Sequence, residues 1–271
     1  GKCVIILPGP PGELAPMFNE SVRGFLKKYS DGAIVSHTVN IIGMGESSVA
    51  EEIENMFDAK NPTVAPYAKS GEVRLRITAK AETADEADRM CAPVVDEICS
   101  RLGDVVYGTD MNSIEERVVA LLKEKGKKIA TAESCTAGYI PKRLTDIPGA
   151  SEVFECGIVS YSNDIKTKLL GVSPKTLEIY GAVSEQTARE MALGAKRVSG
   201  ADIAISTTGL AGPGGDGVLP GGLSFAAVTD GERTVVEKIV TGHENDREYN
   251  RYVTASRALN LVRLMLEEKI K

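Results

Sequence analysis

Residues 127–140 read KKIATAESCTAGYI, and this stretch decides the fold class of the second half of the chain. Its first part, 128–132, is an apolar run typical of a buried strand, and 134–144 is predicted to be a helix. A strand that passes directly into a helix is the repeating unit of layered α/β folds. The junction also places three possible nucleophiles side by side, namely Ser134, Cys135 and Thr136.

Strands and helices continue to alternate on both sides of this stretch. Ser113, with Glu116 three residues later, forms a capping box that predicts a helix start ahead of RVVALLKEKG. The elements predicted after that helix are strands at 128–132, 153–160, 202–207, 223–229 and 234–240, and helices at 134–144, 164–170, 185–198 and 247–269. Residues 111–271 are therefore expected to form a three-layer α/β/α domain.

Residues 33–108 carry a second and smaller pattern. Strands at 33–42, 64–68 and 73–81 alternate with helices at 46–57 and 84–102, which predicts a small α+β domain with the order of a KH-like fold. A KH domain that binds nucleic acid needs a GxxG clamp with basic flanks. The corresponding turn, 43–46, reads GMGE, which has the wrong spacing and an acidic residue. Nucleic acid is therefore not an expected partner of this domain.

Residues 1–32 form one further unit, with a strand at 4–7, a Pro/Gly turn at 8–12 and a helix at 13–28. Apolar residues gather on one face of that helix, namely Leu14, Phe18, Val22, Phe25 and Leu26. One such unit is too small to fold alone. We expect it to be the end of a further domain, so that the chain begins in the interior of a longer one.

Composition and charge narrow the function classes. The chain has 271 residues, 42% hydrophobic and 26% charged, as is typical of a globular protein with two domains. A net charge of -6 without a long basic block argues against general polyanion binding. No segment has the roughly 18 to 20 apolar residues of a membrane helix. The five scattered cysteines suit a reducing cytoplasm and predict no metal site. A cytoplasmic protein is expected.

The junction at Ser134 has two interpretations from the residues alone. A serine between a strand and a helix is most simply the helix N-cap. The same turn holds a side-chain oxygen over free backbone N–H groups, which is the geometry that an oxyanion hole requires. Cys135 has two interpretations as well, because a thiol at a helix N-terminus has a lowered pKa, whereas a free cysteine is often only packed in a core.

A hydroxyl nucleophile needs a base, and the chain has only two histidines, His37 and His243. His37 lies in the α+β domain, and His243 lies in a polar turn, TGHEND, where exposure is expected. No GxSxG elbow occurs. Lys166, in the first turn of the helix at 164–170, becomes a base if burial or positive charge lowers its pKa; otherwise it is a solvated helix lysine.

The three residues at 161–163, shortly before Lys166, are further candidates for the site. Tyr161, Ser162 and Asn163 either cap the helix or bind a substrate amide and sugar hydroxyls.

A glycine-rich loop at 209–222 follows the strand that ends near Thr207 and Thr208. Ligands of α/β folds bind at such strand ends, and glycines let the backbone approach an anion closely. The alternative is a mobile loop. Arg247, at the start of the last helix, is either a surface residue or a phosphate clamp.

Several of these strings together resemble one family. TAESCTAG, GIVSYSNDIKTKLLGV, YGAVSEQTAREMA, STTGLAGPGG with GGLSFAAV, and NDREYNR are similar, in this order, to the C-terminal domain of the CinA family, from Met111 to the end of the chain. Residues 33–108 resemble the family's KH-like domain. LPGPPGELAPMF resembles the tail of its N-terminal molybdopterin-cofactor-biosynthesis-like domain, most of which is missing, so the ADP-ribose pyrophosphatase activity linked to that domain is not expected.

The resemblance implies hydrolysis of nicotinamide mononucleotide to nicotinate mononucleotide and ammonia, without metal or cofactor. It implies Ser134 as nucleophile, Lys166 as general base and Tyr161 as a group that polarises the reaction or passes the proton. N–H groups near Cys135 and Thr136 would stabilise the oxyanion. The substrate contacts expected from the resemblance and from the residues are Cys135, Thr136, Ser162, Asn163, Thr207, Thr208, Gly209, Gly212 and Arg247.

A second hypothesis is a regulatory or binding module in competence or the DNA damage response, which only the family's name suggests. Release of ammonia from nicotinamide mononucleotide supports the first hypothesis, and salt-dependent DNA binding without deamidation supports the second. A homodimer is also expected. The flexible polar loop and the amphipathic last helix, with one face formed by Tyr252, Leu259, Val262 and Leu266, leave room for it.

Overall fold

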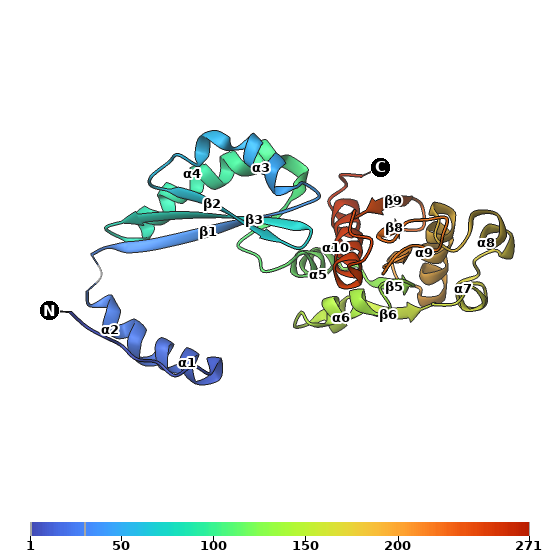
Figure 1. Ribbon diagram of the computed structural model, residues 1–271, viewed down its shortest axis with the longest axis horizontal. Helices are drawn as coiled ribbons and strands as arrows, with labels where there is room; N and C mark the ends of the chain where they lie inside the picture. The colour runs from blue at the N-terminus through green and yellow to red at the C-terminus, as the bar shows by residue number, and fades with distance from the viewer. Residues whose placement is uncertain (1, 30, 271) are drawn as a thin grey trace.

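Two sheets organise the molecule, whose computed structural model describes residues 2–29 and 31–270. One has four strands in the order β2-β3-β1-β4, and the other has five in the order β6-β5-β7-β8-β9. The helix α10 (Arg247–Leu266) lies between the two sheets (Figure 1). No helix of the described residues is long and apolar enough to cross a membrane.

The first sheet and its two α-helices form the α+β domain. The strands are antiparallel, and α4 packs along β1 and β3, so that the helices cover one face of the sheet. Its elements are β1 (Ala33–Ile42), α3 (Glu46–Glu52), a 3-10 turn (Glu54–Met56), β2 (Thr63–Lys69), β3 (Glu72–Ala81), α4 (Ala84–Leu102), a second 3-10 turn (Gly103–Val105) and β4 (Val106–Thr109). The last strand was not predicted, because four residues carry too little periodicity.

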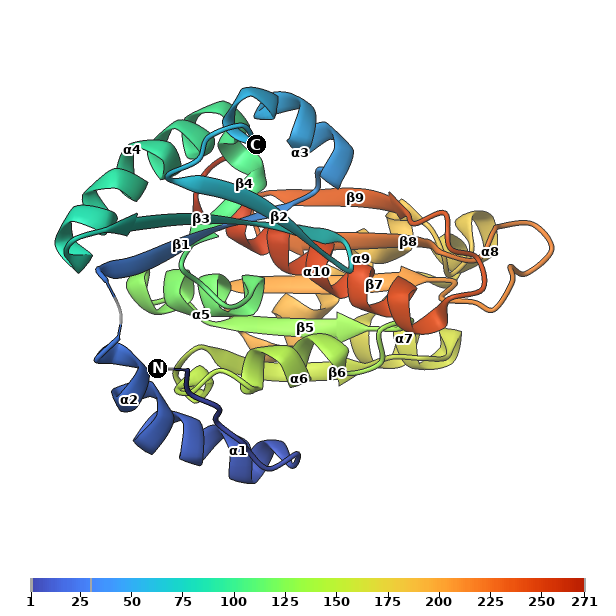
Figure 2. The same cartoon turned by 60° about the vertical axis from the view of Figure 1, so that its left-hand side comes forward.

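The second sheet is the centre of the α/β/α domain. Strands β5, β6 and β7 are parallel, and β8 and β9 continue the sheet antiparallel. Helix α9 contacts all five strands. On the opposite side α10 and α6 contact the sheet, and α5 packs against these two helices (Figure 2). The predicted three-layer fold, preceded by a small α+β domain, is therefore confirmed.

The elements of this domain follow the predicted order with one addition, the short helix α8. They are α5 (Ile114–Glu124), β5 (Ile129–Glu133), α6 (Tyr139–Thr145), a 3-10 turn (Ala150–Glu152), β6 (Phe154–Val159), α7 (Asn163–Leu170), α8 (Pro174–Tyr180), α9 (Glu185–Ser199), β7 (Ile203–Gly209), β8 (Leu223–Thr229), β9 (Thr234–Val240) and α10. Ser113 caps α5 by accepting the N–H of Glu116 at 3.4 Å, and the Glu116 carboxylate accepts the N–H of Asn112 rather than that of Ser113.

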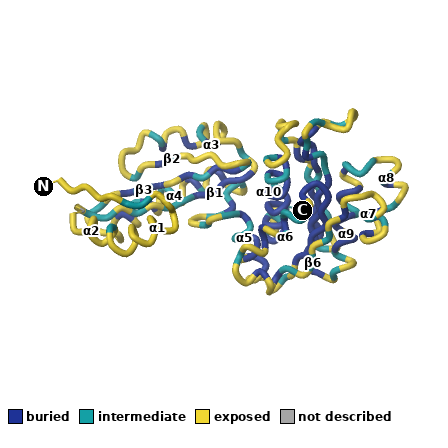
Figure 3. The backbone as a smooth tube through the Cα atoms, turned by 60° about the horizontal axis from the view of Figure 1, so that its bottom comes forward, coloured by how far each residue is buried: buried dark blue, intermediate teal, exposed yellow. Residues whose placement is uncertain are grey.

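The N-terminal segment differs in part from the prediction. The helix forms as α1 (Pro11–Met17), a π-helical turn (Phe18–Val22) and α2 (Arg23–Lys27), and it buries none of its side chains (Figure 3). The predicted strand at 4–7 is wrong, because no neighbouring strand offers it hydrogen bonds and Val4 and Ile6 are 86% and 87% exposed. That residues 1–32 end a further domain stays a prediction.

Helix α10 is buried nearly all round, not on one face. Leu259, Val262 and Leu266 belong to the core of the α/β/α domain itself. This helix therefore offers no free apolar face, so the amphipathic last helix does not support a homodimer, while the homodimer itself stays a prediction.

The two domains meet at a buried carboxylate. Glu72, at the start of β3, is 5% exposed and accepts hydrogen bonds from the hydroxyls of Tyr107 at 2.9 Å and of Tyr252 at 3.4 Å. Arg74 donates to the backbone carbonyls of Met111 and Asn112 in the segment that joins the domains. These contacts connect the α+β domain to α10, whose first turn reaches the site described next.

Candidate active site

The loop that carries Ser134 begins at the carboxyl end of β5. The side chain of Glu133, the last residue of that strand, holds the loop. Its carboxylate is fully buried and accepts the N–H of Ile140 at 3.2 Å, at the start of α6. The N–H groups of Gly138 and Tyr139 also bind it. Burial raises the pKa of the Glu133 carboxyl, while these N–H groups act in the opposite direction.

The predicted helix start at Ser134 is therefore wrong. Helix α6 begins at Tyr139, after Ala137 and Gly138, both of which have positive φ angles (51° and 88°). The Glu133 carboxylate takes the free N–H groups of the helix start, so Ser134 is not a cap. Five residues, 134–138, instead form a loop over the strand end, and its serine is free for another role.

Three parallel strands bring the site together, because their carboxyl ends lie at one edge of the sheet. Ser134 follows β5, Ser160 follows β6, and Thr208 lies near the end of β7. Lys166 comes from α7, which follows β6. Its Nζ lies 3.0 Å from the Oγ of Ser134, 2.8 Å from the carbonyl oxygen of Ser160 and 3.2 Å from that of Tyr161.

Lys166 has an unusual environment for a lysine. The residue is 1% exposed, and among the described residues it forms no ion pair with a carboxylate. Burial lowers the pKa of its amine below the ordinary value of 10.5. A neutral amine donates two N–H hydrogens, which match the two carbonyls, and its lone pair then faces the Ser134 hydroxyl. The geometry is that of a nucleophile with its base.

Cys135 lies beside this pair with opposite properties. It is 6% exposed, and burial raises the pKa of its thiol to about 12. A thiol with a raised pKa is a poor nucleophile near neutral pH. The lowered pKa considered from the sequence is therefore not found, although the side chain does line the site cavity.

The predicted threonine contacts fall into two groups. Thr136 and Thr207 are fully buried and bond to each other through their hydroxyls at 2.6 Å, so they fix the loop and do not line the cavity. Thr208 lines the cavity, with its hydroxyl donating to the carbonyl of Ala182 at 2.6 Å.

The cavity next to Ser134 has a volume of about 320 Å³. Its walls are Ser134, Cys135, Tyr161, Lys166, Ala182, Val183, Thr208, the loop 209–215 and Arg247. Arg247 donates to the carbonyl of Gly212 at 2.7 Å, and Asn250 donates to that of Ala211 at 2.9 Å, so α10 holds the glycine-rich loop.

The three residues at 161–163 also fall into two groups, because one lines the cavity and two do not. Tyr161 lines the cavity, and its side chain points to an open region, since the residue is 63% exposed. Ser162 caps α7 by accepting the N–H of Ile165 at 3.3 Å. Ser162 and Asn163 are exposed and are not among the described residues that line the cavity. The structure therefore supports the capping interpretation for Ser162.

Sequence reasoning missed several residues of the site. Glu133, Ala182, Val183 and Asn250 were not singled out, and the Ser160 carbonyl was not expected to bind the lysine. Glu133 could have been found from the sequence, because it is a charged residue in an otherwise apolar strand, and a buried carboxylate needs hydrogen-bond partners. A backbone carbonyl leaves no signal in the sequence.

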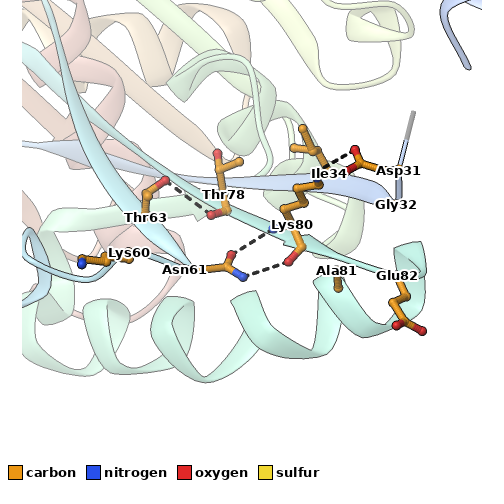
Figure 4. Close-up of a pocket in the computed structure, with 10 residues that line it drawn as sticks. All are labelled: Asp31, Gly32, Ile34, Lys60, Asn61, Thr63, Thr78, Lys80, Ala81 and Glu82. Carbon is orange, nitrogen blue, oxygen red and sulfur yellow. Dashed lines mark hydrogen bonds and ion pairs between the residues drawn. The ribbon is translucent and has the colours of Figure 1, made fainter. Parts of the chain in front are cut away.

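A larger cavity, of about 840 Å³, lies in the α+β domain and lacks these features (Figure 4). Lys80 forms an ion pair there with Asp31 at 2.9 Å, and Asn61 bonds to the backbone of Lys80. None of the described residues that line it pairs a nucleophile with a base. Residues 2–29 and 31–270 contain no group of three or more His, Cys, Asp or Glu that could hold a metal ion.

Neither histidine lies at the site. His37 binds Asp110 at 2.7 Å and Asp88 at 2.9 Å, and the hydrogen bond to Asp110 raises its pKa. His243 is exposed, as expected, with its ring 4.3 Å from that of Tyr249.

Comparison with known families agrees with both domains. The family described as the CinA C-terminal domain matches residues 111–266, and the family described as the damage-inducible protein CinA KH domain matches residues 36–108. The chain belongs to the CinA family. The predicted resemblance is thereby confirmed.

Relatives with CinA names are similar over nearly the whole chain. A protein from Clostridium beijerinckii named as competence-damage inducible is 53% identical over 90% of this chain, and a CinA-like protein from Desulfovibrio desulfuricans is 45% identical over 97%. The chain spans 60% and 62% of the length of these two relatives.

Solved structures of the CinA family match the α/β/α part. The competence/damage inducible protein CihA from Agrobacterium tumefaciens is 38% identical, with a TM-score of 0.54 over 57% of this chain and 93% of that one. The CinA superfamily protein from Escherichia coli is 32% identical, with a TM-score of 0.53 over 57% and 92%.

Proposed function

We propose that this chain is a nicotinamide-nucleotide amidohydrolase, which converts nicotinamide mononucleotide and water to nicotinate mononucleotide and ammonia. The observation that carries the proposal is the contact between Ser134 Oγ and the buried Nζ of Lys166, which has no carboxylate partner among the described residues. The choice of substrate rests on the resemblance to the CinA family.

In the first half of the reaction, neutral Lys166 accepts the hydroxyl proton of Ser134 as Oγ attacks the carboxamide carbon. Negative charge then develops on the carbonyl oxygen. The N–H groups of Cys135 and Thr136 donate to no backbone carbonyl of the described residues, and both face the sulfur of Cys135. They are the donors proposed for that oxygen. Lys166 returns the proton to the leaving nitrogen, ammonia departs, and an acyl-enzyme remains.

In the second half, water attacks the acyl carbon while Lys166 accepts one of its protons. The bond to Ser134 Oγ breaks, the proton returns to Oγ, and the product is the carboxylic acid. The balance is one amide and one water consumed for one acid and one ammonia. Tyr161 is proposed to polarise the carbonyl or pass this proton, since it lines the same cavity.

The substrate contacts keep their proposed roles in part. Thr208, Gly209, Gly212 and Arg247 line the cavity and are proposed to meet the ribose and the phosphate. Thr136 and Thr207 are proposed to act only by holding the loop, since both hydroxyls are engaged with each other. The cavity volume of about 320 Å³ lies within the range of small-molecule sites.

The test is release of ammonia from nicotinamide mononucleotide by this chain, with Ser134→Ala as the comparison. We expect release by the unchanged protein and a mass increase on Ser134 in a quenched turnover. Unaltered turnover by Ser134→Ala, together with no adduct, would contradict the mechanism. Salt-dependent DNA binding without any ammonia release would favour the regulatory hypothesis instead.

A further inference from the structure

Arg247 and Arg251 lie one helical turn apart at the start of α10, within the stretch NDREYNR. Together with Tyr139 and Glu248 they line a cavity of about 360 Å³. Arg247 also lines the catalytic cavity, whereas Arg251 is not among the described residues of that wall. The second cavity therefore adjoins the catalytic one at Arg247 and has its own cation.

Both guanidinium groups lack a counterion. Within residues 2–29 and 31–270, neither forms an ion pair, and the bonds they donate go to the backbone carbonyls of Gly212 and Thr136. Of the seven other arginines of the α/β/α domain, Arg197 donates to the carbonyl of Leu170 and forms no ion pair among the described residues. The other six each pair with a carboxylate, namely Arg117, Arg143, Arg189, Arg233, Arg257 and Arg263. Two adjacent uncompensated guanidinium groups on one cavity attract an anion.

The other walls restrict the kind of anion. The Cζ of Arg251 lies over the ring of Tyr139, 5.7 Å from its centre, and the Cζ of Arg143 lies 5.9 Å from the same ring, so Tyr139 helps to hold Arg251 in place. The carboxylate of Glu248 repels a bare anion, but it accepts hydrogen bonds from hydroxyl groups. A further hollow of about 210 Å³ shares Tyr139 and Glu248 and is also lined by Ser70, Asp246, Tyr249 and Tyr252. Asp246 adds a second carboxylate there, so this hollow favours hydroxyl groups over an anion.

We propose that Arg247 and Arg251 bind the phosphate group of a nucleotide, with Glu248 accepting hydrogen bonds from its ribose hydroxyls. Fork-shaped guanidinium groups suit phosphate oxygens, and a carboxylate accepts from sugar hydroxyls. Ser70 comes from the turn between β2 and β3, so the α+β domain forms part of this site. The nucleotide is either the proposed substrate itself or a second molecule.

Binding at this site is coupled to the nucleophile loop. Arg251 donates to the carbonyl of Thr136 at 2.6 Å, two residues after Ser134. A phosphate that draws this guanidinium toward itself changes how the loop is held, and the effect is reciprocal. The identity of the nucleotide as substrate rests on the proposed function, whereas phosphate binding by the two arginines is measured without turnover.

The test is calorimetric titration of Ser134→Ala protein, at low salt, with inorganic phosphate, AMP and nicotinamide mononucleotide. We expect phosphate binding that weakens at least tenfold in Arg251→Gln and is partly restored in Arg251→Lys. Arg189→Gln, which removes a paired arginine on α9, is the matched control and should bind normally.

Because Arg251→Gln also frees the Thr136 carbonyl, a second variant separates binding from folding. Glu248→Gln removes the repulsive carboxylate and is expected to bind inorganic phosphate severalfold more tightly, a gain that misfolding does not produce. Glu244→Gln, outside the cavity lining, should change nothing.

Competition between phosphate and nicotinamide mononucleotide assigns the site to the substrate's own phosphate, and simultaneous binding assigns it to a second nucleotide. The proposal is overturned by absence of phosphate binding, or by binding that needs Arg247 and is insensitive to Arg251→Gln and Glu248→Gln. Phosphate binding by Ser134→Ala, together with no ammonia release by the unchanged protein, would refute the proposed function and leave this site standing.

Discussion

Lys80 and Lys166 are both cavity lysines, yet their surroundings differ in every respect that sets basicity. Lys80, in the larger cavity of the α+β domain, has a side chain 53% exposed and paired with Asp31. Lys166, in the smaller cavity of the α/β/α domain, is 1% exposed and contacts only carbonyls and a hydroxyl. Lys80 therefore lies in water beside a carboxylate, whereas burial lowers the pKa of Lys166 and favours its neutral form.

This difference shows that the volume of a cavity does not indicate which cavity is the candidate active site of this molecule. The cavity of about 840 Å³ holds a satisfied ion pair, and the cavity of about 320 Å³ holds an amine with a lowered pKa beside a hydroxyl. Perturbed titratable groups, rather than volume, mark functional sites.

The largest effect is expected from removing each lysine in turn. Lys166→Met should lower kcat/KM for ammonia release by about 10³-fold or more, because no other described group bonds to the Ser134 hydroxyl as a base. Lys80→Met is the matched control and should change the rate less than about twofold. Comparable losses in both variants would mean that the two lysines do not differ in function.

The next prediction concerns a carboxylate placed beside Lys166, as Asp31 lies beside Lys80. Cys135 lies close to the amine, so Cys135→Asp should raise the pKa of Lys166 and lower the rate at neutral pH by on the order of 10 to 100-fold. Cys135→Asn, which has similar size and no charge, should stay within about fivefold of the unchanged protein.

The sign of the pH dependence follows from the neutral amine being the active form. Below the pKa of Lys166 the rate rises about tenfold for each pH unit, and above the pKa it levels off. Because burial lowers that pKa from 10.5, the plateau starts below 10.5 in the unchanged protein and at higher pH in Cys135→Asp. A variant profile without an upward shift would disprove a role for this amine as base.

A smaller effect is expected at Glu133, which lies under the loop and not in the cavity lining. Glu133→Gln replaces an acceptor oxygen by a donor that faces N–H groups, so kcat should fall about tenfold with a smaller change in KM. Glu124→Gln, on the exposed end of α5, is the control. Urea unfolding distinguishes the cases, because a change in stability with normal kcat would make Glu133 purely structural.

These sites also show which parts of the fold could be predicted from the sequence. Periodicity predicted β1, α4, β8 and β9 with the bounds observed, since their apolar patterns agree with their burial. It failed for the strand at 4–7, because a strand also needs a hydrogen-bonding neighbour. It failed at Ser134, because the N–H groups of α6 are taken by Glu133, a partner that a local capping rule does not consider.

The candidate site was predictable in its side chains and not in its backbone. Because the chain has only two histidines, Lys166 was predicted as a candidate base, and in the structure its Nζ lies 3.0 Å from the Oγ of Ser134. The two carbonyls that orient its amine come from Ser160 and Tyr161, and any residue supplies a carbonyl. Which of them points at the lysine depends on where β6 ends in three dimensions.

The smallest effect is expected from the ion pair of Lys80 itself. Lys80→Ala removes its bond to Asp31, whose side chain is 94% exposed, so the urea concentration at the midpoint of unfolding should barely change. Added salt should reduce even this difference, because an exposed pair is screened. Urea unfolding at low and high salt measures it. A large fall in the midpoint would mean that the exposed pair stabilises the domain, and the contrast between a solvated lysine and a buried one would not hold.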